Sequence, residues 1–323
     1  IYKSGLNVVG SPRLGGMVRH DTLSLGNATD DVMPDGRLVS SRRDALRQIP
    51  SVRNGLSVVS VFAQTAVLIY LAVYFGPIAW LPVFVFMGRA HAQFASLMHE
   101  AAHRLLFRNR TLNDFVGRWL IGYVGFTNTD AYRRVHMAHH REEFGPNEPD
   151  IALYANYPIS AASWRRKLVR DAQGRTGLRL LRDQLRGARS EVVVVRNTLF
   201  KILAVQAVLI VGAIVAGYWW VYPLFWLLPY LTVWRVINRL RSVAEHGGLM
   251  ASDDRRIATH SVKQHWSARF FLVPFNIGFH LAHHVDAGVP FRNLPKYHQM
   301  LTSSSYVQNQ YPNYRSLWSA LHT

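Results

Sequence analysis

The stretch His136-Met137-Ala138-His139-His140 places three histidines within five residues. If it is helical, positions i, i+3 and i+4 share one face, and the three imidazoles lie within an arc of about 100°. Neutral imidazole is a common ligand for iron, zinc, copper and nickel. The stretch therefore predicts a metal site on one face of a helix.

Two further clusters repeat this chemistry. The triplet returns at His280-Leu281-Ala282-His283-His284, and His99-Glu100-Ala101-Ala102-His103 adds a pair at i and i+4. A chain with 15 histidines in 323 residues has about one chance in a thousand of carrying two such triplets at random. A single His-x-x-x-His pair would be weak evidence. Together, the three clusters favour a metal site over ordinary structural histidines.

The composition limits the classes of partner. The net charge is +18 and 49% of the residues are hydrophobic. A basic balance of this size is typical of proteins that bind nucleic acid, an anionic membrane surface or an acidic protein. The long apolar runs favour the membrane over nucleic acid, and an acidic protein partner stays open. The absence of cysteine excludes disulfides, iron–sulfur clusters, thiolate zinc sites and a cysteine nucleophile.

The apolar runs predict about four transmembrane helices in two hairpins. Residues 56–75 carry no charge and have about the length that spans a bilayer, and residues 77–98 form the second pass. The charge-free run 202–234 forms the second hairpin around the aromatic turn 218–222, which is typical of a membrane interface. The outer ends of both hairpins are basic, so we expect them to face the cytoplasm.

The rest of the chain is expected outside the bilayer. We assign residues 1–54 to a cytoplasmic arm, 55–301 to the catalytic domain and 302–323 to a C-terminal tail. Residues 112–126 are too short to span and are expected to be interfacial or re-entrant. Residues 164–201 carry eleven Lys or Arg against three acidic residues. They predict an amphipathic helix on the anionic cytoplasmic leaflet, with an ordinary solvated helix as the alternative. The arginines of its basic face are Arg175, Arg179, Arg182, Arg186 and Arg189.

The three clusters and the histidine of a Glu-His pair all fall on the predicted cytoplasmic side, where they can converge. These histidines are His99, His103, His136, His139, His140, His246, His280, His283 and His284. One ion rarely uses more than six ligands, so nine imidazoles imply two ions. Spacing alone does not choose among iron, copper and zinc. A dimetal centre beside hydrocarbon suggests O2-dependent oxidation of a lipid-like substrate, because side-chain acids and bases cannot break alkyl C–H bonds.

The order of these motifs resembles the membrane fatty acid desaturases and their relatives. The resemblance covers about residues 56–301 and includes the three histidine clusters, Pro149-Asp150 and Arg241-Ser242-Val243-Ala244-Glu245-His246. It implies an all-α integral membrane protein whose cytoplasmic helical cap holds the dimetal site. It also implies a non-haem diiron centre with the nine histidines as iron ligands, O2 as co-substrate and electrons from a separate carrier.

The family resemblance leaves the reaction open. Many desaturases have a Leu-Phe-Pro-like step after the third cluster, where this chain has Val285-Asp286-Ala287-Gly288. Desaturation of a fatty acyl chain is the leading expectation, and hydroxylation or oxidative decarboxylation to a terminal alkene is the alternative. The pair at residues 99–103 also fits a membrane zinc metalloprotease with Glu100 as general base, which leaves both triplets unexplained. A metal transporter would hold its site nearer the bilayer midplane.

Other polar residues near the clusters are candidates for supporting roles. Glu100, Asp150 and Glu245 neighbour expected ligands and are predicted to accept the far N–H of an imidazole, which orients it. Exposed or ion-paired carboxylates are the alternative. Arg89 and His91 interrupt the second pass and are candidates for binding a substrate carboxylate or head group, unless the helix has already left the hydrocarbon there.

An external source of electrons is expected, because the chain has no dinucleotide fingerprint, no fused haem domain and no cysteine. A ferredoxin, rubredoxin or cytochrome with its reductase fits this requirement. The basic cytoplasmic surface would suit docking of such an acidic carrier. No nucleic acid partner is expected.

Overall fold

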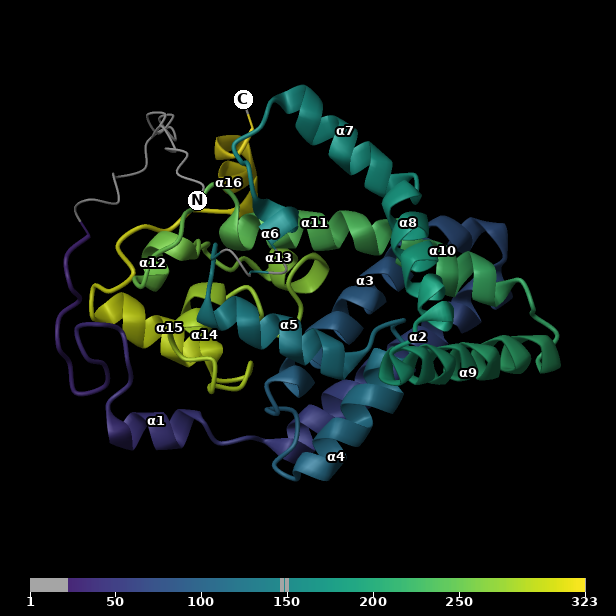
Figure 1. The fold of residues 1–323 in the computed structure, drawn as a ribbon, viewed down its shortest axis with the longest axis horizontal. Coiled ribbons are helices and arrows are strands. Elements are labelled where there is room, and N and C mark those ends of the chain that lie inside the picture. Colours follow the sequence, from purple (N-terminus) through teal and green to yellow (C-terminus); the bar gives the residue numbers. More distant parts are fainter. Residues whose placement is uncertain (1–22, 146–147, 149–150, 323) are drawn as a thin grey trace.

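The computed structural model of the protein describes residues 23–145, 148 and 151–322. Within these residues the secondary structure is helical and no β-strand is formed, which confirms the all-α prediction. Helix α3 runs through the middle of the molecule and packs against α2, α5, α10 and α11 (Figure 1). The short helices α14 and α15 lie at one end of this arrangement, beside α5 (Figure 1).

The first apolar hairpin consists of α2 (Ser51–Phe75) and α3 (Pro77–Ala102). Gly76 makes the turn with a φ of +62°, a conformation that glycine adopts without steric cost. Pro77 then begins α3, where its missing N–H costs no helical hydrogen bond. From Met87 onward α3 is almost entirely buried. Its apolar packing therefore carries the first histidine pair into the interior.

The second apolar hairpin has one continuous arm and one broken arm. Helix α9 (Val193–Val215) leads through Gly217 into the π-helix η4 (Tyr222–Leu227), α10 (Leu228–Leu231) and α11 (Val233–His246). Thr232, with φ −119° and ψ −85°, separates α10 from α11. A Cβ on Gly88 would lie 2.3 Å from the Val233 side chain. The glycine thus allows α11 to lie against α3.

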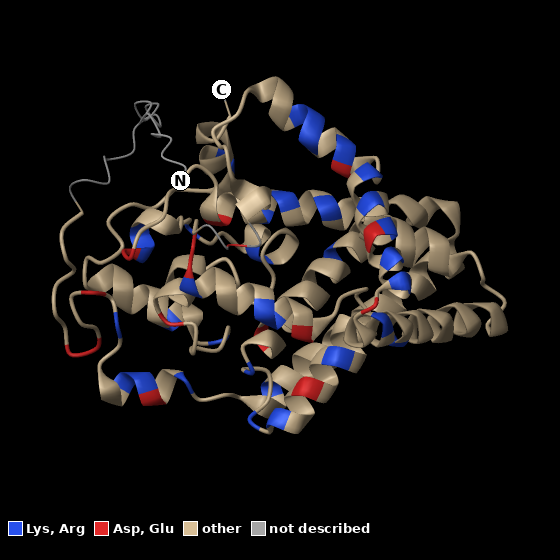
Figure 2. Ribbon diagram, viewed as in Figure 1, with Lys and Arg blue, Asp and Glu red and all other residues tan. Residues whose placement is uncertain are grey.

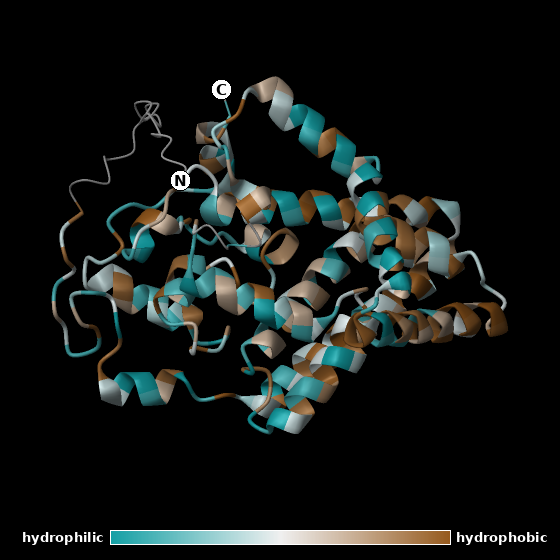
Figure 3. Ribbon diagram, in the orientation of Figure 1, coloured by the Kyte–Doolittle hydropathy of each residue, from teal (hydrophilic) through white to brown (hydrophobic). Residues whose placement is uncertain are grey.

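Two helical segments are long and apolar enough to cross a membrane. One is the segment Ser40–Phe75, which contains α2, and the other is α9. After Lys201, α9 carries no charged residue and is strongly hydrophobic (Figures 2 and 3). Helix α3 is less apolar because Arg89, His91 and Gln93 interrupt it. Two of the four expected passes are therefore supported by length and composition.

The second histidine cluster lies on α5 (Thr129–Arg141), as its spacing predicts. The side chain of Asn128 caps this helix by accepting hydrogen bonds from the N–H groups of Asp130 and Ala131. Helix α4 (Arg110–Phe115) and the π-helix η2 (Val116–Gly122) precede it and pack against α3. They occupy the segment that we expect at the interface.

The basic segment is not one amphipathic helix, which corrects the prediction for residues 164–201. It forms α7 (Ala161–Ala172), α8 (Arg175–Leu185) and the 3-10 helix η3 (Arg186–Arg189), before α9 begins. The break falls at Gly174, which has a φ of +74°. At this break the buried Asp171 pairs with Arg239 of α11, at 3.2 Å from Nη2. This ion pair anchors the break to the core, and α7 and α8 diverge from it (Figure 1).

Short helices complete the fold. They are α1 (Ser40–Leu46), α6 (Ile151–Tyr154), α12 (Arg255–Ala258), α13 (Trp266–Phe271), α14 (His280–Val285), α15 (Leu294–Ser303) and α16 (Tyr314–Ala320). Leu317 and Leu321 are fully buried in a cluster with Val243 of α11. The end of the chain therefore packs onto the helix that carries His246. The domain limits at residues 54 and 301 stay predictions.

Candidate metal centre

Four helices bring the nine predicted histidines together. His99 lies in the last turn of α3 and His103 directly follows that helix. Helix α5 carries the second cluster, α14 carries the third, and His246 ends α11. Their ligand nitrogens fall into two groups, and within each group every nitrogen lies within 4.8 Å of the others.

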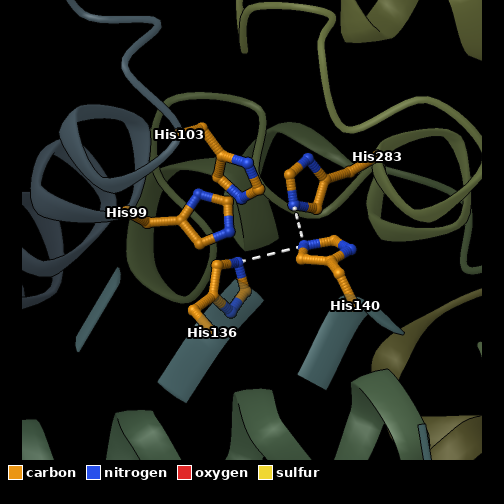
Figure 4. A group of neighbouring side chains, drawn as sticks. All are labelled: His99, His103, His136, His140 and His283. Carbon is orange, nitrogen blue, oxygen red and sulfur yellow. Dashed lines mark hydrogen bonds between the residues drawn. The ribbon is translucent and has the colours of Figure 1, made fainter. Parts of the chain in front are cut away.

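The first group, called here the five-histidine group, consists of His99, His103, His136, His140 and His283. Figure 4 shows these imidazoles pointing toward a common centre. The Nε2 atom of His140 lies 3.1 Å from Nε2 of His136 and 3.0 Å from Nε2 of His283. The second, four-histidine group consists of His139, His246, His280 and His284. Its His280 Nε2 lies 3.0 Å from Nε2 of both His246 and His284.

The division follows a rule that spacing alone does not reveal. In α5 the i, i+4 pair His136 and His140 belongs to the five-histidine group, and His139 belongs to the other. In α14 the i, i+4 pair belongs to the four-histidine group, and His283 crosses to the five-histidine group. Side chains four residues apart lie one above the other, whereas the third diverges. Each triplet therefore contributes to both groups.

The donor set fits metal ions. Two nitrogens that each lie about 2.1 Å from the same ion, with an N–metal–N angle of about 90°, are about 3.0 Å apart. This distance matches the Nε2–Nε2 separations given above. Ligand imidazoles must be neutral. Burial, and then the neighbouring imidazoles, hold the pKa of His136, His140, His283 and His284 well below the ordinary value. The groups therefore present neutral nitrogens in the arrangement that coordination requires.

Hydrogen bonds at Nδ1 orient three imidazoles of the four-histidine group. His139 donates to Glu148, His284 donates to Glu143, and His246 donates to the carbonyl oxygen of Ala258 at 2.8 Å. Each bond fixes the ring and leaves Nε2 free to bind an ion. A carboxylate in this position also makes the imidazole a more basic ligand.

The two carboxylates differ in their surroundings. Burial raises the pKa of Glu143 to about 7, although Arg255, whose Nη1 lies at 2.7 Å, opposes this. Burial acts the same way on Glu148, but hydrogen bonds from His139 and Tyr154 outweigh it and hold the pKa of Glu148 below its ordinary value. Glu148 is therefore the more firmly ionised of the two.

Sequence reasoning missed both Glu143 and Glu148. The available signal was the run of carboxylates in the loop after the second cluster, where only Asp150 was selected. Asp150 lies outside the described residues. Glu245 lies 3.7 Å from Nδ1 of His280 and pairs with Arg241 at 3.2 Å. It is therefore close to a ligand, as its position in the sequence suggests.

The other candidates lie in different surroundings. Glu100 is buried and accepts a hydrogen bond from the N–H of Phe291 at 3.1 Å, which ties α3 to the loop after α14. Arg89 donates to the carbonyl oxygen of Phe270 and to Gln64, both at 2.6 Å. His91 Nε2 donates to the carbonyl oxygen of Trp226 at 3.0 Å. Both side chains are thus engaged by the protein, and each also lines a cavity.

Three cavities lie along the centre of the molecule. A cavity of about 130 Å³ is lined by ligands of both groups. A second, of about 180 Å³, shares Tyr132, Asn238 and Arg241 with it. A third, of about 300 Å³, is almost wholly apolar, lies between α2, α3, α9 and η4, and shares Phe94 with the second. Neighbouring cavities thus form a series from the candidate metal centre to the apolar hairpins.

Comparisons with known proteins agree with this geometry. The family model described as fatty acid desaturase matches residues 61–318, a range that contains all nine histidines. Dihydrorhizobitoxine desaturase from Bradyrhizobium elkanii is 27% identical over 237 residues, or 67% of this chain. The match spans 66% of that relative's length, slightly less than two thirds.

Proposed function

Because this chain belongs to the fatty acid desaturase family, we propose that it is a membrane oxidoreductase that uses O2 to desaturate an alkyl chain at two iron ions. The convergence of nine imidazoles into groups of five and four carries this proposal. A mononuclear zinc protease uses three protein ligands. The pair His99 and His103 instead lies with three further imidazoles, which favours the oxidoreductase.

The residues have separable roles in this proposal. The nine histidines hold the two ions, and Glu143 and Glu148 orient His284 and His139 from the second layer. Bound iron supplies an O2-derived oxidant strong enough to remove hydrogen from an unactivated C–H bond. The chain itself positions that bond and limits access of water, since seven of the nine histidines are buried and the other two, His103 and His140, are partly buried. The same centre serves hydroxylation or decarboxylation if the substrate presents a different bond.

The proposed substrate has an alkyl chain. The family implies a lipid substrate, and the apolar cavity of about 300 Å³ is lined by Phe62, Ile69 and Leu209 among others. Burial of methylene groups in such a cavity is favourable by about 0.8 kcal/mol each. The alkyl chain of the substrate could then extend past Phe94 toward the metal centre.

The proposed membrane orientation follows from charge. We place α2 with α3, and α9 with the broken arm from η4 to α11, as two hairpins across the bilayer. The basic helices α7 and α8 and the histidine-bearing ends of α3 and α11 then lie on the cytoplasmic side. Lys and Arg recur along α7 and α8 (Figure 2). An acidic electron carrier is a natural partner for this surface.

A product profile tests the proposal. The full chain is expressed in a host membrane with a ferredoxin and its reductase, and supplied with O2 and labelled saturated acids. Mass spectrometry that finds loss of two hydrogens supports desaturation. An added oxygen, or a terminal alkene one carbon shorter, assigns the alternative outcome to the same centre. Absence of any O2-dependent product would refute the proposal.

A further inference from the structure

The cavity next to the metal centre has one polar wall, formed by α11. Arg235, Asn238 and Arg241 follow each other at steps of three, and all three line the cavity of about 180 Å³. Asn238 and Arg241 also line the cavity at the metal centre. The two cavities are therefore neighbours, and a molecule with a reacting carbon at the histidines could place its other end near Arg235.

Arg235 differs from its neighbours on α11. Arg239 pairs with Asp171, and Arg241 pairs with Glu245. Arg235 forms no such pair within the described part of the chain. Its Nε and Nη2 atoms are buried without a hydrogen-bond partner, and its guanidinium lies 4.2 Å from the ring centre of Tyr230. The residue as a whole is partly buried, and two of its three guanidinium nitrogens lie against the protein without a hydrogen-bond partner.

Physical chemistry indicates what would satisfy this group. Burying a charged group without a partner is costly, whereas one paired with an opposite charge is tolerated. The planar guanidinium fork matches a carboxylate bidentately. No apolar chain end would offset the cost of the unpaired donors. A carboxylate placed in this cavity would satisfy them.

We propose that Arg235 binds the carboxylate of the substrate, so that the enzyme acts on a free acid rather than on an ester or thioester. The reaction assigned to that acid rests on the proposed function, but binding at Arg235 does not. His246 lies eleven positions after Arg235, which is about 16 Å along α11 at the helical rise. The oxidised bond would then lie several carbons from the carboxylate.

Ligand-dependent unfolding of the full chain, as purified in a non-ionic detergent, tests the proposal without turnover. The probes are octanoate, methyl octanoate and palmitate. We expect the acids to raise the unfolding temperature and methyl octanoate to bind at least about tenfold more weakly. Equal responses to octanoate and its ester would overturn the proposal.

Variants provide the matched comparison. Arg235→Gln should weaken binding of octanoate at least about tenfold. Arg235→Lys should lose less of this affinity, because it keeps the positive charge. Arg37→Gln makes the same chemical change at an exposed site and should respond like the wild type. Without ligand, Arg235→Gln should unfold at the same or a higher temperature, because it removes an unpaired buried charge. A lower temperature, or an unchanged response to acids, would show a structural role and contradict the proposal. If these binding tests fail but the wild-type chain still forms an O2-dependent product, the proposal for Arg235 is wrong and the proposed function still holds.

Discussion

The five-histidine and four-histidine groups are built differently, although they share α5 and α14. All three histidine–carboxylate pairs found in the described part of the chain belong to the four-histidine group. The five-histidine group has one more imidazole and depends on the close packing of α3 against η2, where a Cβ on Gly117 would lie 2.7 Å from Cβ of Ala101. One group is oriented by hydrogen bonds and the other by helix packing, so we expect them to fail for different reasons.

The largest effect is expected from removing a ligand in either group. His103→Ala and His246→Ala should each abolish O2-dependent product formation, because the oxidant requires both ions. The matched control is His265→Ala, which removes an exposed histidine outside both groups. Product formation is measured in membranes with the carrier and its reductase. Full activity in either ligand variant would remove that group from the centre.

A smaller effect, confined to one group, is expected from the orienting carboxylates. Glu148→Gln and Glu143→Gln should each weaken metal binding at the four-histidine group by about 10- to 100-fold. The five-histidine group should keep its affinity. Metal titration of the purified protein measures both, with Asp183→Asn as a control at an exposed carboxylate. An equal loss of metal affinity at both groups would contradict the claim that these carboxylates support the four-histidine group alone.

A substitution in the contact between η2 and α3 tests the role of helix packing. Gly117→Ala should lower the free energy of unfolding by about 1–3 kcal/mol, because the added methyl group overfills the contact between η2 and α3. It should weaken the five-histidine group more than the other. Gly212→Ala adds the same group on α9, where nothing lies within 4 Å, and should have little effect. Unfolding in denaturant, with metal content measured in parallel, makes the comparison.

The smallest effect is expected at Glu245. Its carboxylate lies 3.7 Å from His280, beyond hydrogen-bond distance, and is paired with Arg241. Glu245→Gln should therefore weaken metal binding less than Glu148→Gln does. Metal titration of the two variants shows which of them loses more affinity. A larger loss at Glu245 would mean that its contact to His280 tightens when the ion binds.

The sequence was sufficient for the choice of ligand candidates and for the all-α class. Local spacing carried both, since an i, i+3, i+4 pattern places histidines on one side of a helix. It was insufficient for the division into two groups, because that depends on how α3, α5, α11 and α14 meet. Glu143 and Glu148 were missed for the same reason: a carboxylate in an irregular loop reveals its partner only after the chain has folded. The break at Gly174 likewise depends on a distant ion pair between Asp171 and Arg239.

The most direct test of the central claim is the number of ions that each chain holds. The purified wild type, His103→Ala and His246→Ala are loaded with ferrous iron without O2, and metal content per chain is measured by mass spectrometry. Two separable groups predict about two iron ions in the wild type and about one in each variant. A single ion per wild-type chain, or zinc retained in place of iron, would contradict the account.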